Sequence, residues 1–240
     1  MNLSTSHFVW PNGGTENRVH YTFQWSTLGL GINSSKQNIK EASWDLLFNP
    51  KFKGRITMLD DIRYGIAPAL IKLGFSINTQ DAKQLSKAKS LMIEQKPLVK
   101  AYSSDTYIDL LKSGEVDIVY GYSIDLLQAS KQDKNIVYMI PKEGSTKGVE
   151  SMVIPKNAKH IKLAEAFINY ILEPKVHASI SNYSMAANPN KAALPYIPES
   201  IKSNHNIFPD SSTLEKLVYL QDVGKVTPAY DRIWNEIKNR

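Results

Sequence analysis

Residues 54–74, GRITMLDDIRYGIAPALIKLG, change their hydrophobic periodicity in the middle of the run. Residues 55–59 form a short, largely apolar and β-prone segment, which is typical of a buried strand. From Ile62 onward the apolar residues recur at helical spacing until Gly74 ends the pattern. The segment therefore predicts a strand, a turn and a helix.

Two adjacent carboxylates, Asp60 and Asp61, stand where the predicted strand gives way to the predicted helix. In open α/β sheets, ligands bind at the carboxyl ends of the strands. Aspartate is also one of the preferred residues at a helix N-cap. The pattern alone leaves both interpretations open: Asp61 caps the helix, or it contacts a ligand.

The rest of the chain alternates predicted strands with predicted helices of about ten residues. Strands are predicted at residues 18–33, 55–59, 98–102, 116–121, 136–140 and 149–155. Helices are predicted at residues 43–48, 62–73, 82–95, 105–111, 123–130, 163–172, 175–181, 213–220 and 228–239. This alternation predicts an α/β fold with a mostly parallel sheet that helices cover on both faces.

Composition excludes several classes of protein. The chain has 240 residues and no cysteine, so it contains no disulfide, thiolate metal site or cysteine nucleophile. Its net charge of +6 comes from lysines dispersed along the predicted helices, which indicates solvated faces and argues against nucleic-acid binding. No run is long enough to span a membrane, and the N-terminal residues lack the pattern of a signal peptide. A protein that works outside the cytoplasm would therefore need a signal or anchor that is not in this sequence.

Motifs of catalysis and cofactor binding are absent from the sequence. The five histidines are isolated, without a second histidine or a carboxylate at metal-ligand spacing. No GxSxG, P-loop or SxxK motif occurs, and the GLG at residues 29–31 lacks the third glycine of a nucleotide fingerprint. We therefore predict no metal site, no cofactor and no catalytic residue.

Polar or aromatic residues recur near the ends of the predicted strands: Asp61, Ser104, Tyr122 and Glu150. Two acids and a tyrosine ring suit a cationic ligand, the acids through charge-assisted hydrogen bonds and the ring through a cation–π contact. Each residue also has a structural explanation. Ser104 could cap a helix, Tyr122 could be a half-buried aromatic, and Glu150 could be a surface strand residue.

From about Trp25 to its C-terminus, the chain resembles the spermidine/putrescine-binding proteins of bacterial ABC transporters. The matching segments, in order, are SWDLLFNPKFKG (43–54), LDD (59–61), LGFSINT (73–79), YSSD (102–105), GEVDIVYGY (114–122), PKEG (141–144), SMVIP (151–155), FINYILEP (167–174), ANPNKAAL (187–194) and QDVG (221–224). The resemblance implies the type II periplasmic binding protein fold. In that fold a solute lies between two α/β lobes and no reaction is catalysed.

The resemblance also implies roles for individual residues. Asp61 corresponds to an acid that binds a ligand amine, and Glu150 to a second acid. Tyr122 corresponds to an aromatic residue that packs on the ligand, and Ser104 to a serine that lines the site. Tyr64, Gly148 and Leu220 stand where the family has a carboxylate, an aromatic and an amide, respectively. The expected ligand-binding residues are thus Asp61, Tyr64, Ser104, Tyr122 and Glu150.

The resemblance implies a division of the chain into lobes. Residues 1–27 would be the end of the first lobe and a hinge strand, 28–147 the second lobe, 148–194 the return segment of the first lobe, and 195–240 C-terminal helices that pack on the second lobe. Members of the family have a longer N-terminal part. The first lobe is therefore expected to be incomplete in this chain, which we interpret as one part of a longer protein.

The function that the resemblance implies is that of the solute-binding component of an ABC importer, with a polyamine as its ligand. Its partners would be the permease subunits, and its location periplasmic or otherwise extracytoplasmic, held at the membrane through the transporter. One alternative is the same fold with thiamine, ferric ion or another small solute as ligand. A second alternative, from another class, is an α/β enzyme that uses Asp61 and Glu150 for acid–base catalysis.

Overall fold

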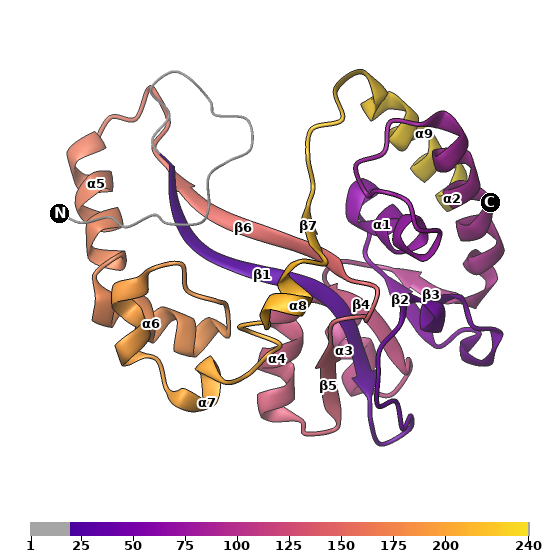
Figure 1. Cartoon of the computed structure of the whole chain (residues 1–240), viewed down its shortest axis with the longest axis horizontal. Helices are drawn as coiled ribbons and strands as arrows, with labels where there is room; N and C mark the ends of the chain where they lie inside the picture. The colour runs from indigo at the N-terminus through magenta and orange to yellow at the C-terminus, as the bar shows by residue number, and fades with distance from the viewer. Residues whose placement is uncertain (1–19, 240) are drawn as a thin grey trace. The chain divides into compact units, whose positions relative to one another are not determined.

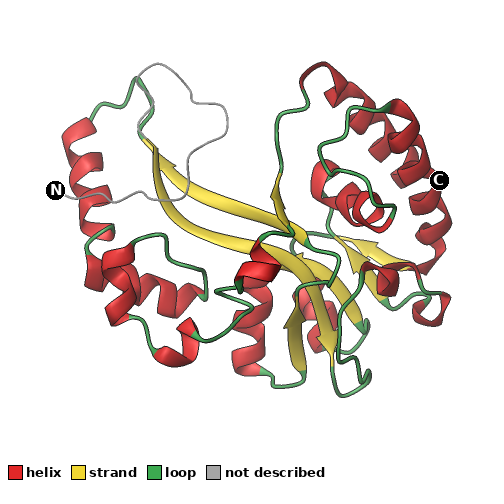
Figure 2. Ribbon diagram, viewed as in Figure 1, coloured by secondary structure: helices red, strands yellow, loops and turns green. Residues whose placement is uncertain are grey.

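The computed structural model describes residues 20–239, and Figure 2 shows their helices and strands. The strands are β1 (His20–Asn33), β2 (Ile56–Met58), β3 (Val99–Tyr102), β4 (Ile118–Tyr122), β5 (Ile136–Met139), β6 (Ser145–Val153) and β7 (Leu217–Tyr219). The α-helices are α1 (Ile62–Lys72), α2 (Ala82–Gln95), α3 (Tyr107–Lys112), α4 (Ser123–Gln132), α5 (Ile161–Ile171), α6 (Pro174–Ser184), α7 (Glu199–Lys202), α8 (Ser211–Leu214) and α9 (Thr227–Asn239). Short 3-10 helices occur at Trp44–Phe48, Pro50–Phe52, Lys96–Leu98, Lys191–Tyr196 and Gly224–Val226. The part of the predicted first strand that precedes His20 lies outside the described residues.

The described chain divides into two compact units. The first unit consists of the described residues up to Ser26 and of Gly148–Phe208. The second unit consists of Thr27–Lys147 and of the described residues from Pro209 onward. The chain passes from one unit to the other within β1, within β6, and at residues 208–209, which is later than the boundary at 194–195 implied by the resemblance.

The strand, turn and helix predicted for residues 54–74 are present in the second unit. The three residues of β2 are completely buried, as expected for a short apolar strand inside a sheet. Asp61 is the N-cap of α1, and Gly74 follows the helix with a positive φ of 72°, a conformation in which glycine carries no steric penalty. Local capping and hydrophobic periodicity therefore explain the strand, turn and helix of residues 54–74.

The sheet of the second unit is mixed, whereas a mostly parallel sheet was predicted. Its strands lie in the order β3-β2-β4-β1, and β5 pairs with β1 as well. Strand β2 is parallel to both β3 and β4, as predicted, but β1 is antiparallel to β4 and β5. A helical crossover fixes the parallel direction of two strands. Strand β1 precedes the first crossover, so local sequence does not determine its direction.

Helices of the second unit pack on one another and on its strands. Helices α1, α2 and α9 are in mutual contact, and α4 packs against β4 and β5 (Figure 1). The aromatic residues of α9 lie inward: Tyr230 is fully buried and Trp234 nearly so. The C-terminal helix is thus part of the core of this unit.

The prediction of a helix over residues 213–220 is wrong. Helix α8 ends at Leu214, and β7 follows and pairs in parallel with Ser145–Lys147 of β6. Over so short a stretch, the apolar residues fit the period of a helix as well as that of a strand. Pairing with β6, which lies far away in the sequence, selects the strand.

The first unit combines parts of β1 and β6 with helices α5 to α7. Its helix α5 is amphipathic, and its apolar side chains Leu163, Phe167 and Tyr170 are 70%, 59% and 58% exposed. Of the described part of α5, Ile168 is the residue that is buried. No helix among residues 20–239 is long and apolar enough to cross a membrane.

His177 on α6 is buried in the first unit, with 1% of its surface exposed. Its Nε2 atom lies 2.6 Å from the carbonyl oxygen of Phe23, and the two rings are stacked. The other ring nitrogen, Nδ1, is buried and has no hydrogen-bond partner among the described residues. Burial lowers the pKa of His177, an effect that the hydrogen bond to Phe23 only partly offsets. The neutral imidazole is therefore the form that fits this site.

We expect the first unit to exchange its amide hydrogens faster than the second. Helix α5 has few buried side chains, whereas β2 and most of β4 are inside a sheet, and sparse burial lowers the free energy of local opening. Amides of residues 161–171 should exchange about tenfold or more faster than those of residues 118–121. Hydrogen-exchange mass spectrometry measures this difference. Equal protection in the two segments would contradict the expectation.

We also expect His177 to make stability depend on pH. Since its pKa is lower in the folded chain than in the unfolded chain, its contribution is fully present above the unfolded value of about 6.5 and decreases as the pH falls through the folded value. Replacing His177 by Gln, which retains a donor for the Phe23 carbonyl, should remove this dependence. Thermal unfolding at pH values between about 5 and 8 tests it. Identical pH profiles for the two proteins would show that His177 does not contribute.

Candidate functional site

Asp61 is fixed by two backbone hydrogen bonds. Its Oδ1 atom accepts from the amides of Arg63 at 2.9 Å and Tyr64 at 2.6 Å, the pattern of an N-cap. Its Oδ2 atom accepts no hydrogen bond from any described residue. The carboxylate therefore caps α1 with one oxygen and leaves the second oxygen available to a ligand. The two interpretations that the sequence left open for Asp61 are compatible with each other.

The neighbouring acid, Asp60, has a different role. Both of its carboxylate oxygens accept hydrogen bonds from Lys238 Nζ, at 2.7 and 2.6 Å. This ion pair ties the turn after β2 to the end of α9. The local pattern held no signal for the role of Asp60, because its partner is 178 residues away in the chain.

Tyr64 and Tyr122 lie close to Asp61. Their rings are 6.2 Å apart between centroids and meet edge to face at 84°. Burial and, to a smaller extent, the negative charge of Asp61 raise the pKa of Tyr122 to about 12. Burial, followed by Asp61, also raises the pKa of Tyr64. Both phenols are therefore neutral at physiological pH, and the structure brings together one carboxylate and two aromatic rings.

Arg63 holds the start of α1 in place. Its guanidinium donates to the carbonyls of Gln221 and Ile77 at 3.1 Å and to Asn78 Oδ1 at 2.9 Å, and it lies 4.6 Å from the centroid of the Tyr230 ring. The Asn78 Oδ1 atom also accepts from the Gln221 amide at 2.9 Å. The segments LGFSINT and QDVG thus meet at Arg63. Their contacts fix the helix that carries Asp61 and Tyr64.

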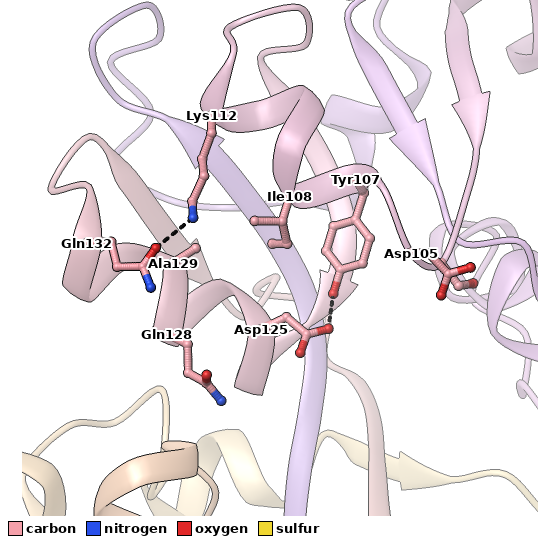
Figure 3. Close-up of a pocket in the computed structure, with 9 residues that line it drawn as sticks. Asp105, Tyr107, Ile108, Lys112, Asp125, Gln128, Ala129 and Gln132 are labelled. Atoms are coloured by element: carbon pink, nitrogen blue, oxygen red, sulfur yellow. Dashed lines mark hydrogen bonds between the residues drawn. The ribbon is translucent and has the colours of Figure 1, made fainter.

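Ser104 lies in the turn after β3, is half-buried, and lines a cavity of about 400 Å³. Figure 3 shows other residues of this cavity, on α3 and α4. The cavity is lined by Ser104, Asp105, Tyr107, Ile108, Lys112, Asp125, Gln128, Ala129 and Gln132. Ser104 does not cap α3. Instead Ser103 Oγ accepts from the amides of Asp105 and Thr106, at 3.2 and 3.0 Å.

Tyr107 is a residue of this region that the sequence analysis did not identify. Figure 3 shows its hydroxyl directed at Asp125, and the distance from Oη to Asp125 Oδ2 is 2.5 Å. The same hydroxyl accepts from the backbone amide of Tyr122 at 3.3 Å. An aromatic residue at the start of an amphipathic helix normally predicts a residue of the hydrophobic core. The sequence pattern therefore did not indicate the contact with Asp125.

Glu150 belongs to the first unit, on β6, and its side chain is exposed. Its Oε2 atom accepts a hydrogen bond of 2.6 Å from Nε2 of Gln24 on β1. Gln24 is buried, and its own Oε1 atom has no partner among the described residues. Sequence did not indicate Gln24, because a glutamine inside an aromatic strand has no distinguishing pattern.

Comparison with known proteins places this architecture in one family. Residues 8–205 match the family model described as bacterial extracellular solute-binding protein. The putrescine/cadaverine-binding protein of Pseudomonas aeruginosa is 32% identical, over 93% of this chain and 67% of that protein.

Two solved structures are also similar. A putative spermidine/putrescine ABC transporter protein from Listeria monocytogenes has a TM-score of 0.84 and 29% identity, over 91% of this chain and 68% of that one. The spermidine/putrescine ABC transporter substrate-binding protein PotD of Streptococcus pneumoniae has a TM-score of 0.82 and 28% identity, over 92% and 68%. The chain spans about two thirds of the length of these relatives.

The resemblance seen in the motifs is thereby confirmed at the level of family and fold. The α/β architecture with a mixed sheet is shared with the two solved structures, at identities above 25%. The chain belongs to the family of bacterial extracellular solute-binding proteins.

Proposed function

We propose that this chain is the solute-binding component of an ABC importer and that its ligand is a polyamine such as putrescine or spermidine. The observation that carries the proposal is the cluster of Asp61, Tyr64 and Tyr122 in the second unit. One oxygen of the Asp61 carboxylate accepts no hydrogen bond from residues 20–239, and it lies beside two neutral tyrosine rings. Ser104, in the same unit, belongs to the proposed site as well, and Glu150, in the first unit, stays a prediction from the resemblance.

The chemistry of the cluster matches an alkylammonium ion. Primary amines with the pKa of a lysine side chain, about 10.4, are protonated at neutral pH. An ammonium group donates strong hydrogen bonds to a carboxylate and is attracted to the face of an aromatic ring. Asp61 Oδ1 is occupied by backbone amides, so Oδ2 would accept from the ligand. The rings of Tyr64 and Tyr122 would contact its charge or its methylene chain.

The names of the relatives support a polyamine over other solutes. The similar proteins are described as binding putrescine, cadaverine or spermidine. Under this proposal the chain works outside the cytoplasm, docks on permease subunits at the membrane and catalyses no reaction.

The proposal is tested by titrating isotope-labelled chain with putrescine, cadaverine and spermidine and following its amide resonances. This measurement detects affinities down to the millimolar range. We expect shifts that concentrate on Asp61, Tyr64 and Tyr122. Thiamine and ferric citrate serve as comparison solutes. Shifts with either of these and none with the amines would overturn the polyamine assignment.

Replacing Asp61 by Asn should weaken polyamine binding while the fold is retained. Asparagine is as good an N-cap as aspartate, so α1 keeps its two hydrogen bonds and loses only the charge. We expect a loss of about 1.5–3 kcal/mol, roughly 10- to 150-fold in affinity, the range for a hydrogen bond to a charged group. Isothermal titration calorimetry measures it.

A matched control is Asp81→Asn. Asp81 caps α2 through the amides of Lys83 and Gln84, in the same way that Asp61 caps α1, and its side chain is exposed. This variant removes a capping charge from the same unit without touching the cluster. Equal affinity losses in the two variants would mean that Asp61 acts on affinity only through the net charge of the unit. Its assignment as a ligand contact would then be wrong.

Substitutions of Tyr122 separate a ligand contact from a packing role. Tyr122→Ala removes the ring and should weaken binding by about 0.5–2 kcal/mol, the range of a cation–π contact. Tyr122→Trp should keep or improve binding, because indole presents the better face to a cation. The measurement is calorimetry with putrescine. If alanine and tryptophan give the same affinity, the ring of Tyr122 does not touch the ligand.

A further inference from the structure

Tyr107, the first residue of α3, connects two segments of the second unit through a single hydroxyl. The side chain is 1% exposed. Its Oη atom donates to Asp125 Oδ2 at 2.5 Å and accepts from the backbone amide of Tyr122 at 3.3 Å. Figure 3 shows the first of these bonds, between α3 and α4. The hydroxyl thus bridges α3 to the junction at which β4 ends and α4 begins.

The ring of Tyr107 fits this junction because residue 121 is a glycine. A Cβ atom at position 121 would lie 2.3 Å from Cε2 and 2.8 Å from Cζ of the Tyr107 ring. Real Cβ atoms do not approach other atoms so closely, and a buried ring has no room to retreat. The pair Gly121 and Tyr107 therefore acts as one packing unit directly before Tyr122.

The direction of the hydrogen bonds follows from the ionisation of the groups. Burial raises the pKa of Tyr107, and the hydrogen bond to Asp125 raises it further, so the phenol stays neutral. Its proton points to the carboxylate of Asp125, and a lone pair remains for the amide of Tyr122. Tyr122 is the N-cap of α4 and has no side-chain cap of its own. The Tyr107 hydroxyl is the partner of its amide among the described residues.

We propose that Tyr107 is a positioning residue of the ligand site: through its hydroxyl it fixes the backbone of Tyr122 and thereby the ring that faces Tyr64 and Asp61. The inference rests on the proposed function for its effect on affinity. The positioning itself does not require a ligand. Asp125 completes the arrangement, because its carboxylate holds the hydroxyl in the orientation that leaves the lone pair for Tyr122.

The variant that isolates the hydroxyl is Tyr107→Phe, since phenylalanine keeps the ring against Gly121. Without ligand, the aromatic resonances of Tyr64 and Tyr122 report their edge-to-face contact. We expect these resonances to shift toward values averaged over several relative orientations of the two rings. We also expect the Tyr122 amide to exchange with solvent faster. If neither the resonances nor the exchange of Tyr122 changes, the positioning role is overturned, whatever the ligand of the protein is.

Calorimetry with putrescine then tests the consequence for binding. Tyr107→Phe should weaken binding about 3- to 10-fold, as expected for the loss of a hydrogen bond that preorganises a site. In the Tyr122→Ala background the same substitution should have no effect, because Tyr107 acts through Tyr122. Additive losses in the double variant would show that Tyr107 supports the fold in general and does not position Tyr122.

The control is Gln95→Met. Gln95 of α2 is a buried polar residue of the second unit, and its Nε2 atom donates to the carbonyl of Leu47 at 2.8 Å. This variant loses one buried hydrogen bond, as Tyr107→Phe does, and should leave affinity unchanged. If the original chain binds no amine, the proposed function fails, while the ligand-free measurement still decides the role of Tyr107.

Discussion

Close packing around β1 is the constraint on which the second unit depends. Residues 28–33 of this strand are buried, and the strand pairs with β4 on one edge and β5 on the other. A Cβ atom at Gly29 would lie 2.7 Å from the hydroxyl of Tyr138, and one at Gly31 would lie 2.2 Å from Cδ2 of Leu126. The GLG of this strand therefore provides room for neighbouring side chains. It is also the strand that pairs Leu28 with Tyr122, so this packing fixes the end of β4 that carries the candidate site.

Several residues of the segments that carry the family resemblance join loops to one another. The indole of Trp44 donates to the carbonyl of Gly144 at 2.8 Å, and Ser43 donates to Glu143 at 2.5 Å, so SWDLLF and PKEG meet. Asn188 of ANPNKAAL donates to the carbonyl of His177 at 3.1 Å within the first unit. The buried indole N–H of Trp44 thus finds its acceptor 100 residues away in the chain.

Within the second unit, neighbouring residues of the candidate site have different structural roles. Asp60 forms an ion pair with Lys238, Asp61 caps α1, and Arg63 clamps the same helix to the C-terminal segment. Tyr64 then faces Tyr122 from the first turn of the helix. Several independent contacts thus fix the start of α1. That is the usual condition for holding a carboxylate and two rings in a fixed arrangement before a ligand arrives.

The sequence by itself determined what depends on near neighbours: the strand, turn and helix of residues 54–74, the capping carboxylate, and the alternation that indicates an α/β fold. It also determined the family, because ten motifs in a fixed order leave few alternatives. Only the tertiary structure decided the antiparallel direction of β1, the strand β7 in place of a helix, and the ion pair of Asp60 with Lys238. The contact of Tyr107 with the Tyr122 amide belongs to the same group. Capping and periodicity act over three or four residues and can be deduced from the chain locally, whereas strand pairing and buried hydrogen bonds join residues whose proximity exists only after folding.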